Sequence, residues 1–348
     1  MTALAGVAAS AREHVSKRSL AARVEERLII PSYASRWSFA SVFLHRAMSL
    51  PLQLAGQAYR RSVRLGGERI EMLSLGREKL IEPLCTQVFG QLPTPRYEGR
   101  RLALNPDSLS DPGAGLILAE VHRWLAPAFR RAGWLIVPHS VRWHGELASV
   151  PPAQPSKSLL ANLAKVRKHQ FSLVQGTSPE DWNEFYTAMV QPQAHARHGA
   201  SAWIASRPFI QSLAKRGTLH LIVENDIRVA GACTVSYGDK LWFPILGVRH
   251  GDSQLLQRGA SVAALALPIE WARANGYRRL DLGRTGPFVN DGLQHYKRKW
   301  GLVPVRDPLS HVTAVWIGSA EVRLAFSRDP LLVENDEDGL EVYAGESR

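Results

Sequence analysis

Three β-rich segments between residues 218 and 248 constrain the fold of this 348-residue chain most strongly. They cover Thr218–Glu224, Arg228–Ser236 and Leu241–Val248. Two short turn-forming segments separate them, Asn225-Asp226 and Tyr237-Gly238-Asp239. Polar or glycine-containing turns between apolar, β-branched runs are typical of hairpins, because these residues accept the backbone angles that tight turns require. We therefore expect an antiparallel meander of three strands.

The residues after the meander predict a helix and a further strand. The helical pattern runs from about Gly259 to Ala274 and ends at Asn275-Gly276, which is a typical helix stop. The strand Arg279–Leu282 follows. Because a helix joins the last meander strand to this one, the crossover allows the two strands to run parallel. The predicted fold class is therefore α/β (α+β).

Helix and strand signals also alternate upstream of the meander. Leu116–Ala132 predicts a helix, and Trp134–Pro138 predicts a short buried strand. Ser158–His169 predicts a helix with one strongly basic face. Ser178–Asp181 combines an N-cap residue, a first-turn proline and two acids, so a helix should start there. The proline-rich segment Ser149–Pro155 cannot form regular structure, and we place a domain boundary at it.

The charge of the chain predicts an anionic partner. The formal net charge is +12 and the pI is about 10.0, which suits nucleic acid, membrane phosphate or a phosphorylated cofactor. The apolar runs are too short and too often interrupted by charge for a transmembrane helix. Residues 1–30 favour a helical packing arm or a basic amphipathic anchor to anionic lipid, and a peripheral membrane contact would involve residues 1–60. Cys85 and Cys233 are too few for a disulfide framework, so we expect a cytoplasmic protein, with peripheral membrane contact as the alternative.

Five motifs occur in an order that resembles a known group of enzymes. They are Arg258-Gly259-Ala260-Ser261, Ile269-Glu270-Trp271-Ala272, Asn275-Gly276, Asp281-Leu282-Gly283-Arg284 and Tyr296-Lys297-Arg298-Lys299-Trp300-Gly301. This order resembles the branch of the GNAT acyltransferases that contains the Fem-type aminoacyltransferases and the cellulose- and polysaccharide-associated acetyltransferase-like proteins. The resemblance covers residues 155–305 well and residues 70–150 faintly, and it implies two tandem GNAT-like halves.

The resemblance completes the expected domain organisation. Residues 1–65 form a basic helical arm, and residues 66–150 form a degenerate GNAT-like half. Residues 151–310 form the GNAT-type acyltransferase domain, and residues 311–348 form a C-terminal segment with an acidic tail.

The resemblance also implies a donor site at the start of the helix. In a GNAT domain, free backbone N–H groups and the positive end of the helix dipole bind a pyrophosphate. The candidate cofactor-binding residues are Gln257, Arg258, Gly259, Ala260 and Ser261. Acyl-CoA is the expected donor. Aminoacyl-tRNA is the alternative, because this segment contains a single glycine, a reduction that the Fem-type enzymes share.

Lys297 is the first candidate for a catalytic role, since the matching lysine of the Fem-like group lies in the cleft, where a cation stabilises an oxyanion or binds phosphate. The other catalytic candidates are Tyr296, Asp281 and His198. The candidate bases are His295, His198, Glu224 and Asp281. The candidate substrate contacts are Arg197, Arg284, Trp242 and His295. We expect no metal site.

The sequence therefore predicts an N-acyltransferase that moves an acyl group from acyl-CoA to an amine. The expected acceptor is an amine-bearing small molecule or a glycan precursor, in small-molecule or cell-surface polysaccharide modification. The first alternative is an aminoacyl-tRNA-dependent transferase that forms a peptide bond and binds tRNA. The second alternative is a non-catalytic GNAT-like scaffold that docks on a membrane or a synthase complex through residues 1–60.

Overall fold

The computed structural model describes residues 47, 55–90, 92–199, 204–337 and 339–345. Most of the predicted arm over residues 1–65, and with it the predicted membrane contact, lies outside the described residues. The chain divides into two compact units. The smaller unit includes Lys165–Gly238 and Pro244–Pro268, and the larger unit includes the described residues of Val42–Ala164, Asp239–Phe243 and Ile269–Arg348.

The strands form three sheets. They are β1 (Ala55–Leu65), β2 (Glu68–Leu75), β3 (Arg96–Leu102), β4 (Leu116–Val121), β5 (Leu135–Pro138), β6 (Val141–Glu146), β7 (Ser172–Gly176), β8 (Gly217–Glu224), β9 (Ile227–Tyr237), β10 (Lys240–Val248), β11 (Arg279–Thr285), β12 (Val303–Arg306), β13 (Val312–Ile317), β14 (Leu331–Glu334) and β15 (Leu340–Tyr343). The first sheet has the order β3-β1-β2-β4-β13-β5, the second has the order β12-β6-β11-β10-β9-β8-β7, and β14 pairs with β15.

The helices connect and cover these strands. They are α4 (Glu78–Phe89), α5 (Ala126–Arg131), α6 (Lys157–Lys168), α7 (Pro179–Glu184), the π-helix η3 (Phe185–Val190), α8 (Gln191–His198), α9 (Arg207–Ala214), α10 (Ser253–Arg258), α11 (Ala260–Ala274), α12 (Gly292–Lys299) and α13 (Ala320–Arg328). Short 3-10 turns lie at Asp107–Leu109, Leu147–Ser149 and Arg249–Gly251.

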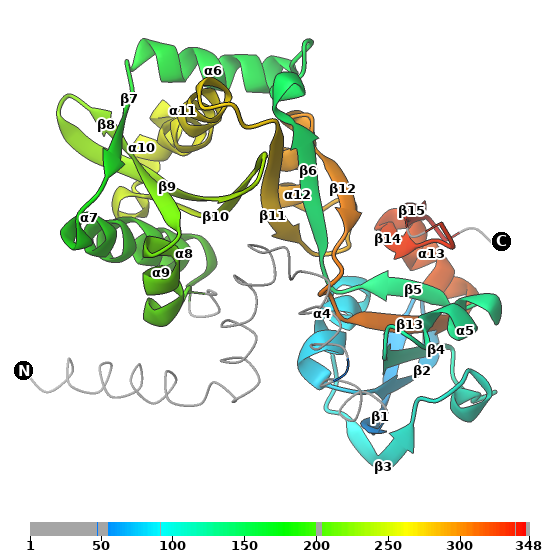
Figure 1. Cartoon of the computed structure of the whole chain (residues 1–348). Helices are drawn as coiled ribbons and strands as arrows, with labels where there is room; N and C mark the ends of the chain where they lie inside the picture. The colour runs from blue at the N-terminus through cyan, green and yellow to red at the C-terminus, as the bar shows by residue number, and fades with distance from the viewer. Residues whose placement is uncertain (1–46, 48–54, 91, 200–203, 338, 346–348) are drawn as a thin grey trace, which may run out of the picture. The chain divides into compact units, whose positions relative to one another are not determined.

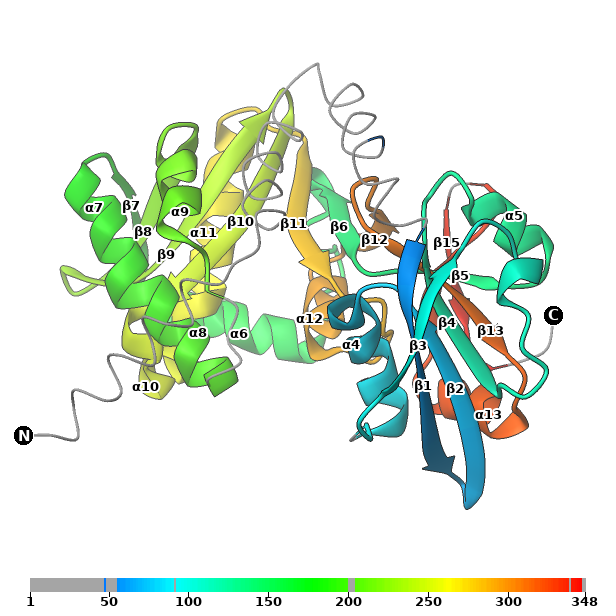
Figure 2. The same ribbon diagram turned by 90° about the horizontal axis from the view of Figure 1, so that it is seen from below.

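The first sheet has an apolar core on each face. Along β4, Ile117 and Ala119 belong to the core that includes Phe129 of α5. Leu116 and Leu118 belong to the opposite core, with side chains from α4 and α13. This alternation is the period of two that a strand imposes. Figure 2 shows α4, α5 and α13 beside the strands of this sheet.

One secondary-structure prediction in this region was wrong. Leu116–Ala132 is not a helix, because its first part is β4 and only Ala126–Arg131 is helical. All six residues of β4 are buried, since the strand lies between β2 and β13 with a core on each face. A short run that is apolar on all sides fits a central strand as well as a buried helix, and its length favours the strand.

The predicted meander and crossover are confirmed. β8 and β9 pair antiparallel, and the turn between them has positive φ angles at Asn225 (49°) and Asp226 (63°). β9 and β10 are neighbours in the sheet. The helix ending near Ala274 leads into β11, which pairs parallel with β10. Two predicted helices are confirmed as well. One begins after the N-cap residue Ser178, with a complete capping box, and the other covers residues 157–168.

The two large sheets share one feature, a parallel strand pair. In the first sheet β2 runs parallel to β4, and in the second β10 runs parallel to β11. At the start of α4, the backbone N–H of Arg77 donates to Oε2 of the buried Glu120 at 3.0 Å. A carboxylate of the chain itself therefore occupies this helix start.

Figure 1 shows β6 and β12 beside β11, with α12 against these strands.

Candidate active site

The central feature of the candidate site is an irregular end of β11 in the larger unit. β11 pairs with β10 only over Lys240–Trp242, opposite Arg279–Asp281. Its antiparallel pairing with β6 shifts between Asp281 and Arg284. Gly283 lies in this shift with a φ of 71°, a conformation that favours glycine. The ladder between β11 and β6 is therefore interrupted at Leu282 and Gly283 and resumes at Arg284.

Helix α12 places Lys297 against this irregular end. The helix starts where the side chain of Asp291 accepts hydrogen bonds from the backbone N–H groups of Leu293 and Gln294, at 2.8 and 3.1 Å. Lys297 is 4% exposed, and its Nζ donates to the carbonyl oxygen of Arg284 at 2.9 Å. The sequence predicted a catalytic role for Lys297 but not the burial of its side chain.

Burial changes the acid–base behaviour of Lys297. Loss of water lowers the pKa of its amine from 10.5 to about 7, although the negative charge of Asp281 opposes this shift. The positive charge of Arg142 lowers the pKa further. An amine with such a pKa exchanges a proton near neutral pH and forms a poorly hydrated cation when protonated. Both properties are useful in acyl transfer.

Asp281 is held by two basic residues of β6. Its Oδ2 accepts from Nε and Nη2 of Arg142, at 2.9 and 2.5 Å, and lies 3.2 Å from Nε2 of His144. Its Oδ1 accepts from the backbone N–H of Gly283 at 2.8 Å. Burial alone would raise the pKa of Asp281, but the hydrogen bond with His144 and the charge of Arg142 lower it to about 2. The carboxylate is thus ionised, which favours an orienting role over that of a base.

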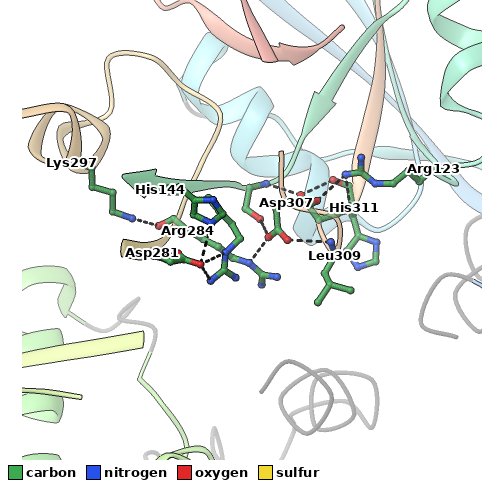
Figure 3. A network of polar contacts seen from close by, with 12 residues as sticks. Arg123, His144, Asp281, Arg284, Lys297, Asp307, Leu309 and His311 are labelled. Carbon is green, nitrogen blue, oxygen red and sulfur yellow. Dashed lines mark hydrogen bonds and ion pairs between the residues drawn. The ribbon is translucent and has the colours of Figure 1, made fainter. Parts of the chain in front are cut away.

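Arg284 continues the polar network toward the first sheet. Its Nε lies 2.5 Å from Oδ2 of the fully buried Asp307. Oδ1 of Asp307 accepts from the backbone N–H of Leu309 at 3.1 Å. Nη2 of Arg123 donates to the Asp307 carbonyl oxygen at 3.2 Å. These contacts, drawn in Figure 3, hold Arg284 in place while a third of its side chain stays exposed.

The other predicted residues of the larger unit lie around this network. Trp242 is buried, and the Arg142 guanidinium carbon lies 5.5 Å from its ring centroid. Tyr296 is half-buried, with its ring 6.3 Å from that of Trp300. His295 is exposed on the same helix. The structure therefore brings Asp281, Lys297, Arg284 and Trp242 together.

The predicted donor segment belongs to the smaller unit and is more helical than expected. α10 ends at Arg258, Gly259 adopts a left-handed φ of 98°, and α11 begins at Ala260. The predicted helix start at Gly259 is thus a junction between two helices. Nη2 of Arg258 lies 3.1 Å from Oε2 of Glu224.

The remaining predicted residues of the smaller unit also lie on helices. Gln257 is exposed and Ser261 is half-buried. Arg197 is exposed near the end of α8, and His198 is its last residue, before Gly199 with a φ of 57°. These residues belong to the smaller unit, whereas Asp281, Arg284, His295, Tyr296 and Lys297 belong to the larger unit.

Sequence reasoning missed Arg142, His144 and Lys240. The first two lie on β6, on the N-terminal side of the proline-rich segment that was taken as a boundary, although the second sheet includes this strand. Lys240 begins β10, where burial lowers the pKa of its amine. Alternation of Arg142 and His144 with the apolar Val141 and Trp143 was the available signal.

Two general features of the described chain bear on function. No helix among the described residues is long and apolar enough to cross a membrane. Within the same residues, no group of three or more His, Cys, Asp or Glu side chains is arranged to hold a metal ion.

Comparisons with known proteins agree with the topology. Residues 157–298 match the family model described as Acetyltransferase (GNAT) domain. A search of curated proteins finds no match. β6 and β12 lie outside the matched residues but extend the same sheet.

Several solved structures share parts of the fold at low identity. L-PGS from Bacillus licheniformis has 12% identity and a TM-score of 0.40, over 75% of this chain and 84% of that one. FemX has 13% identity and a TM-score of 0.37, over 75% and 88%. The ribosomal-protein-S18-alanine N-acetyltransferase from Escherichia coli has 14% identity and a TM-score of 0.29, over 42% and 90%. The sheet topology and the domain match together show that the chain has a GNAT fold, and residues 157–298 are the part that matches the Acetyltransferase (GNAT) domain.

Proposed function

We propose that this protein transfers an acyl group from acyl-CoA to the amine of a small molecule or a glycan precursor. The observation that carries the proposal is the burial of Lys297, whose Nζ donates a hydrogen bond to the Arg284 carbonyl oxygen beside the irregular part of β11. It lies within the residues that match the GNAT acetyltransferase domain.

In the proposed reaction, the amine nitrogen attacks the acyl carbonyl carbon and the thioester C–S bond breaks. Negative charge develops on the carbonyl oxygen in the transition state. A cation in a site of low dielectric stabilises this charge more than water does, because little reorganisation is needed. We assign this role to the protonated Lys297, with Tyr296 as its neighbour on α12. Arg284, Trp242 and His295 are the proposed acceptor contacts in the same unit.

The proposed donor contacts lie at the junction of α10 and α11. The first-turn N–H groups at Ala260 and Ser261 and the positive end of the α11 dipole suit a pyrophosphate. The left-handed Gly259 lets the chain change direction there. Arg258 adds positive charge, although it is also paired with Glu224. Gln257, which is exposed, completes the set.

Thermal unfolding with a panel of acyl-CoA esters tests this proposal. A ligand that binds only the folded state at about 100 times its Kd stabilises it by about 2.7 kcal/mol, which raises the melting temperature by a few degrees. We expect this rise with at least one acyl-CoA and a smaller rise with ADP at the same concentration, because ADP offers only the pyrophosphate end of the donor. The absence of a shift with every ester from acetyl to palmitoyl would count against an acyl-CoA donor.

The second candidate is an aminoacyl-tRNA-dependent transferase, which one surface feature favours. α6 carries four exposed basic residues, Lys157, Lys165, Arg167 and Lys168. On a chain of formal net charge +12, such a helix suits a phosphate backbone.

A gel-shift titration with bulk tRNA at low salt tests this alternative. Replacing the four basic residues of α6 by alanine should weaken binding and reduce its salt dependence. A control variant replaces three exposed basic residues elsewhere, Arg64 of β1 and Arg96 and Arg100 of β3, and should weaken binding less per charge removed. No tRNA binding by the wild-type protein at low salt would exclude this candidate.

A further inference from the structure

His144 occupies the position of an oriented proton acceptor. It lies on β6 directly opposite Asp281 of β11, and its Nε2 is 3.2 Å from Oδ2 of that carboxylate. Asp281 is 3% exposed, whereas the side chain of His144 is 30% exposed. A buried carboxylate thus contacts Nε2 of an imidazole that is itself only partly buried, and Figure 3 shows the two side chains together.

The hydrogen bonds of Asp281 determine which ring nitrogen can accept a proton. An ionised carboxylate only accepts hydrogen bonds, so Nε2 of a neutral His144 must carry the hydrogen. Its Nδ1 then keeps a lone pair. Among the described residues, Nδ1 of His144 has no hydrogen-bond partner in the protein. This is the arrangement that a base needs when a third group fixes its tautomer.

The remaining charges around the pair come from three elements. On β6, Arg142 binds the same Asp281 oxygen as His144, and Glu146 lies exposed two residues beyond His144. Lys240 of β10 and Lys297 of α12 both interact electrostatically with Asp281. From β12, the residue paired with His144 is the uncharged Val303. Arg142 therefore fixes Asp281, and Asp281 fixes the ring of His144.

We propose that His144 is the general base of the transfer reaction and that Asp281 is its positioning residue. This proposal rests on the proposed acyl transfer. The acceptor enters as an ammonium ion and gives one proton to Nδ1 of His144. Its nitrogen then bonds to the acyl carbonyl carbon, and the C–S bond of the thioester breaks. A second proton passes from that nitrogen to the leaving thiolate, and His144 returns its proton to water, so that amide, thiol and one proton are the products.

Replacing His144 by glutamine tests the base directly. In His144→Gln the side-chain amide can still donate to Asp281 but cannot take up a proton. Because general bases contribute about 100- to 10,000-fold, we expect kcat for thiol release from acyl-CoA to fall by about 100-fold or more, with a smaller change in KM. The pH profile of kcat should lose the contribution of this imidazole in the variant, whereas the contribution of Lys297, whose protonated form the reaction needs, should remain. The matched control is His195→Gln, an exposed histidine on α8, which should keep wild-type kcat.

A rescue experiment separates a chemical role from a structural one. Free imidazole should restore part of the activity of His144→Ala, because it supplies the missing proton acceptor. It should not stimulate the wild type. A folded His144→Gln that keeps kcat within about threefold and retains the pH profile would overturn the proposal, since a base contributes far more than that.

The tautomer gives a test that does not depend on turnover. In ¹⁵N spectra of the imidazole nitrogens, neutral His144 should carry its hydrogen on Nε2. Asp281→Asn, if it folds, should weaken that preference. If the wild type consumes no acyl-CoA ester, the proposal of an acyl-CoA donor is wrong, and the ¹⁵N spectra remain as the test of the His144–Asp281 pair. A hydrogen on Nδ1 of the neutral wild-type ring would then overturn the proposed role of that pair.

Discussion

The burial of Lys297 predicts a stability difference that depends on pH, and Lys297→Met measures it. The pKa of this amine falls from 10.5 to about 7 on folding because of burial. Each pKa unit corresponds to about 1.4 kcal/mol, so charging the buried amine costs the folded state up to about 5 kcal/mol.

The sign follows from proton binding in each state. Below about pH 7 both states hold the proton, and the full cost of the buried charge is present. Between about pH 7 and pH 10.5 the unfolded chain binds more protons than the folded one, so wild-type stability rises with pH. Methionine has no such charge. The stability of Lys297→Met relative to the wild type should therefore fall by about 3 kcal/mol between about pH 6 and pH 9.

The loss of the hydrogen bond to the Arg284 carbonyl oxygen adds a constant penalty of about 1–3 kcal/mol, which leaves this slope unchanged. Urea unfolding followed by tryptophan fluorescence gives the free energy of unfolding at each pH. Lys299→Met, an exposed lysine of the same helix, is the matched control and should show a nearly constant difference. A constant difference for Lys297→Met as well would show that its amine stays hydrated.

Two further substitutions test the packing and the charge network. Gly247→Ala should destabilise the protein by about 1–3 kcal/mol or more, because the added Cβ would lie 2.6 Å from the backbone carbonyl carbon of Met189. Gly292→Ala, where the added Cβ meets nothing within 4 Å, should be close to neutral in the same urea titration. Asp281→Asn should cost about 3–5 kcal/mol in a thermal or urea melt, since it leaves the buried Arg142 without its carboxylate; a loss below about 1 kcal/mol would show that the pair is hydrated.

The second half of the chain was the more predictable part of the fold. The turns at Asn225 and Gly238 have the positive φ angles that their residue types favour, so local chemistry alone specified the meander. The segment Leu116–Val121 was misread because burial on both faces removes the alternation that identifies a strand. Its partner strands, β2 and β13, are distant in sequence, so no local sequence pattern indicates this pairing.

The candidate site was only partly predictable for the same reason. The motif around Lys297 pointed to the residue, but its burial depends on the irregular pairing of β11 with β6, a tertiary feature. Arg142 and His144 were missed because the proline-rich segment suggested that β6 belonged to another domain. Strand pairing across that segment brings them to Asp281. The role of Asp281 as an ionised acceptor became visible only with these two partners.

The central claim is acyl transfer that depends on Lys297, and one measurement tests it most directly. Wild-type protein and folded Lys297→Met are incubated with the acyl-CoA esters and a panel of small amines and amino sugars, and the N-acylated product is measured by mass spectrometry. We expect amide product from the wild type and a loss of about 100-fold or more in Lys297→Met, the scale of a removed oxyanion contact. Equal amounts of product from both proteins would contradict the role of Lys297, and no product from the wild type with any ester would contradict acyl-CoA-dependent transfer to these amines.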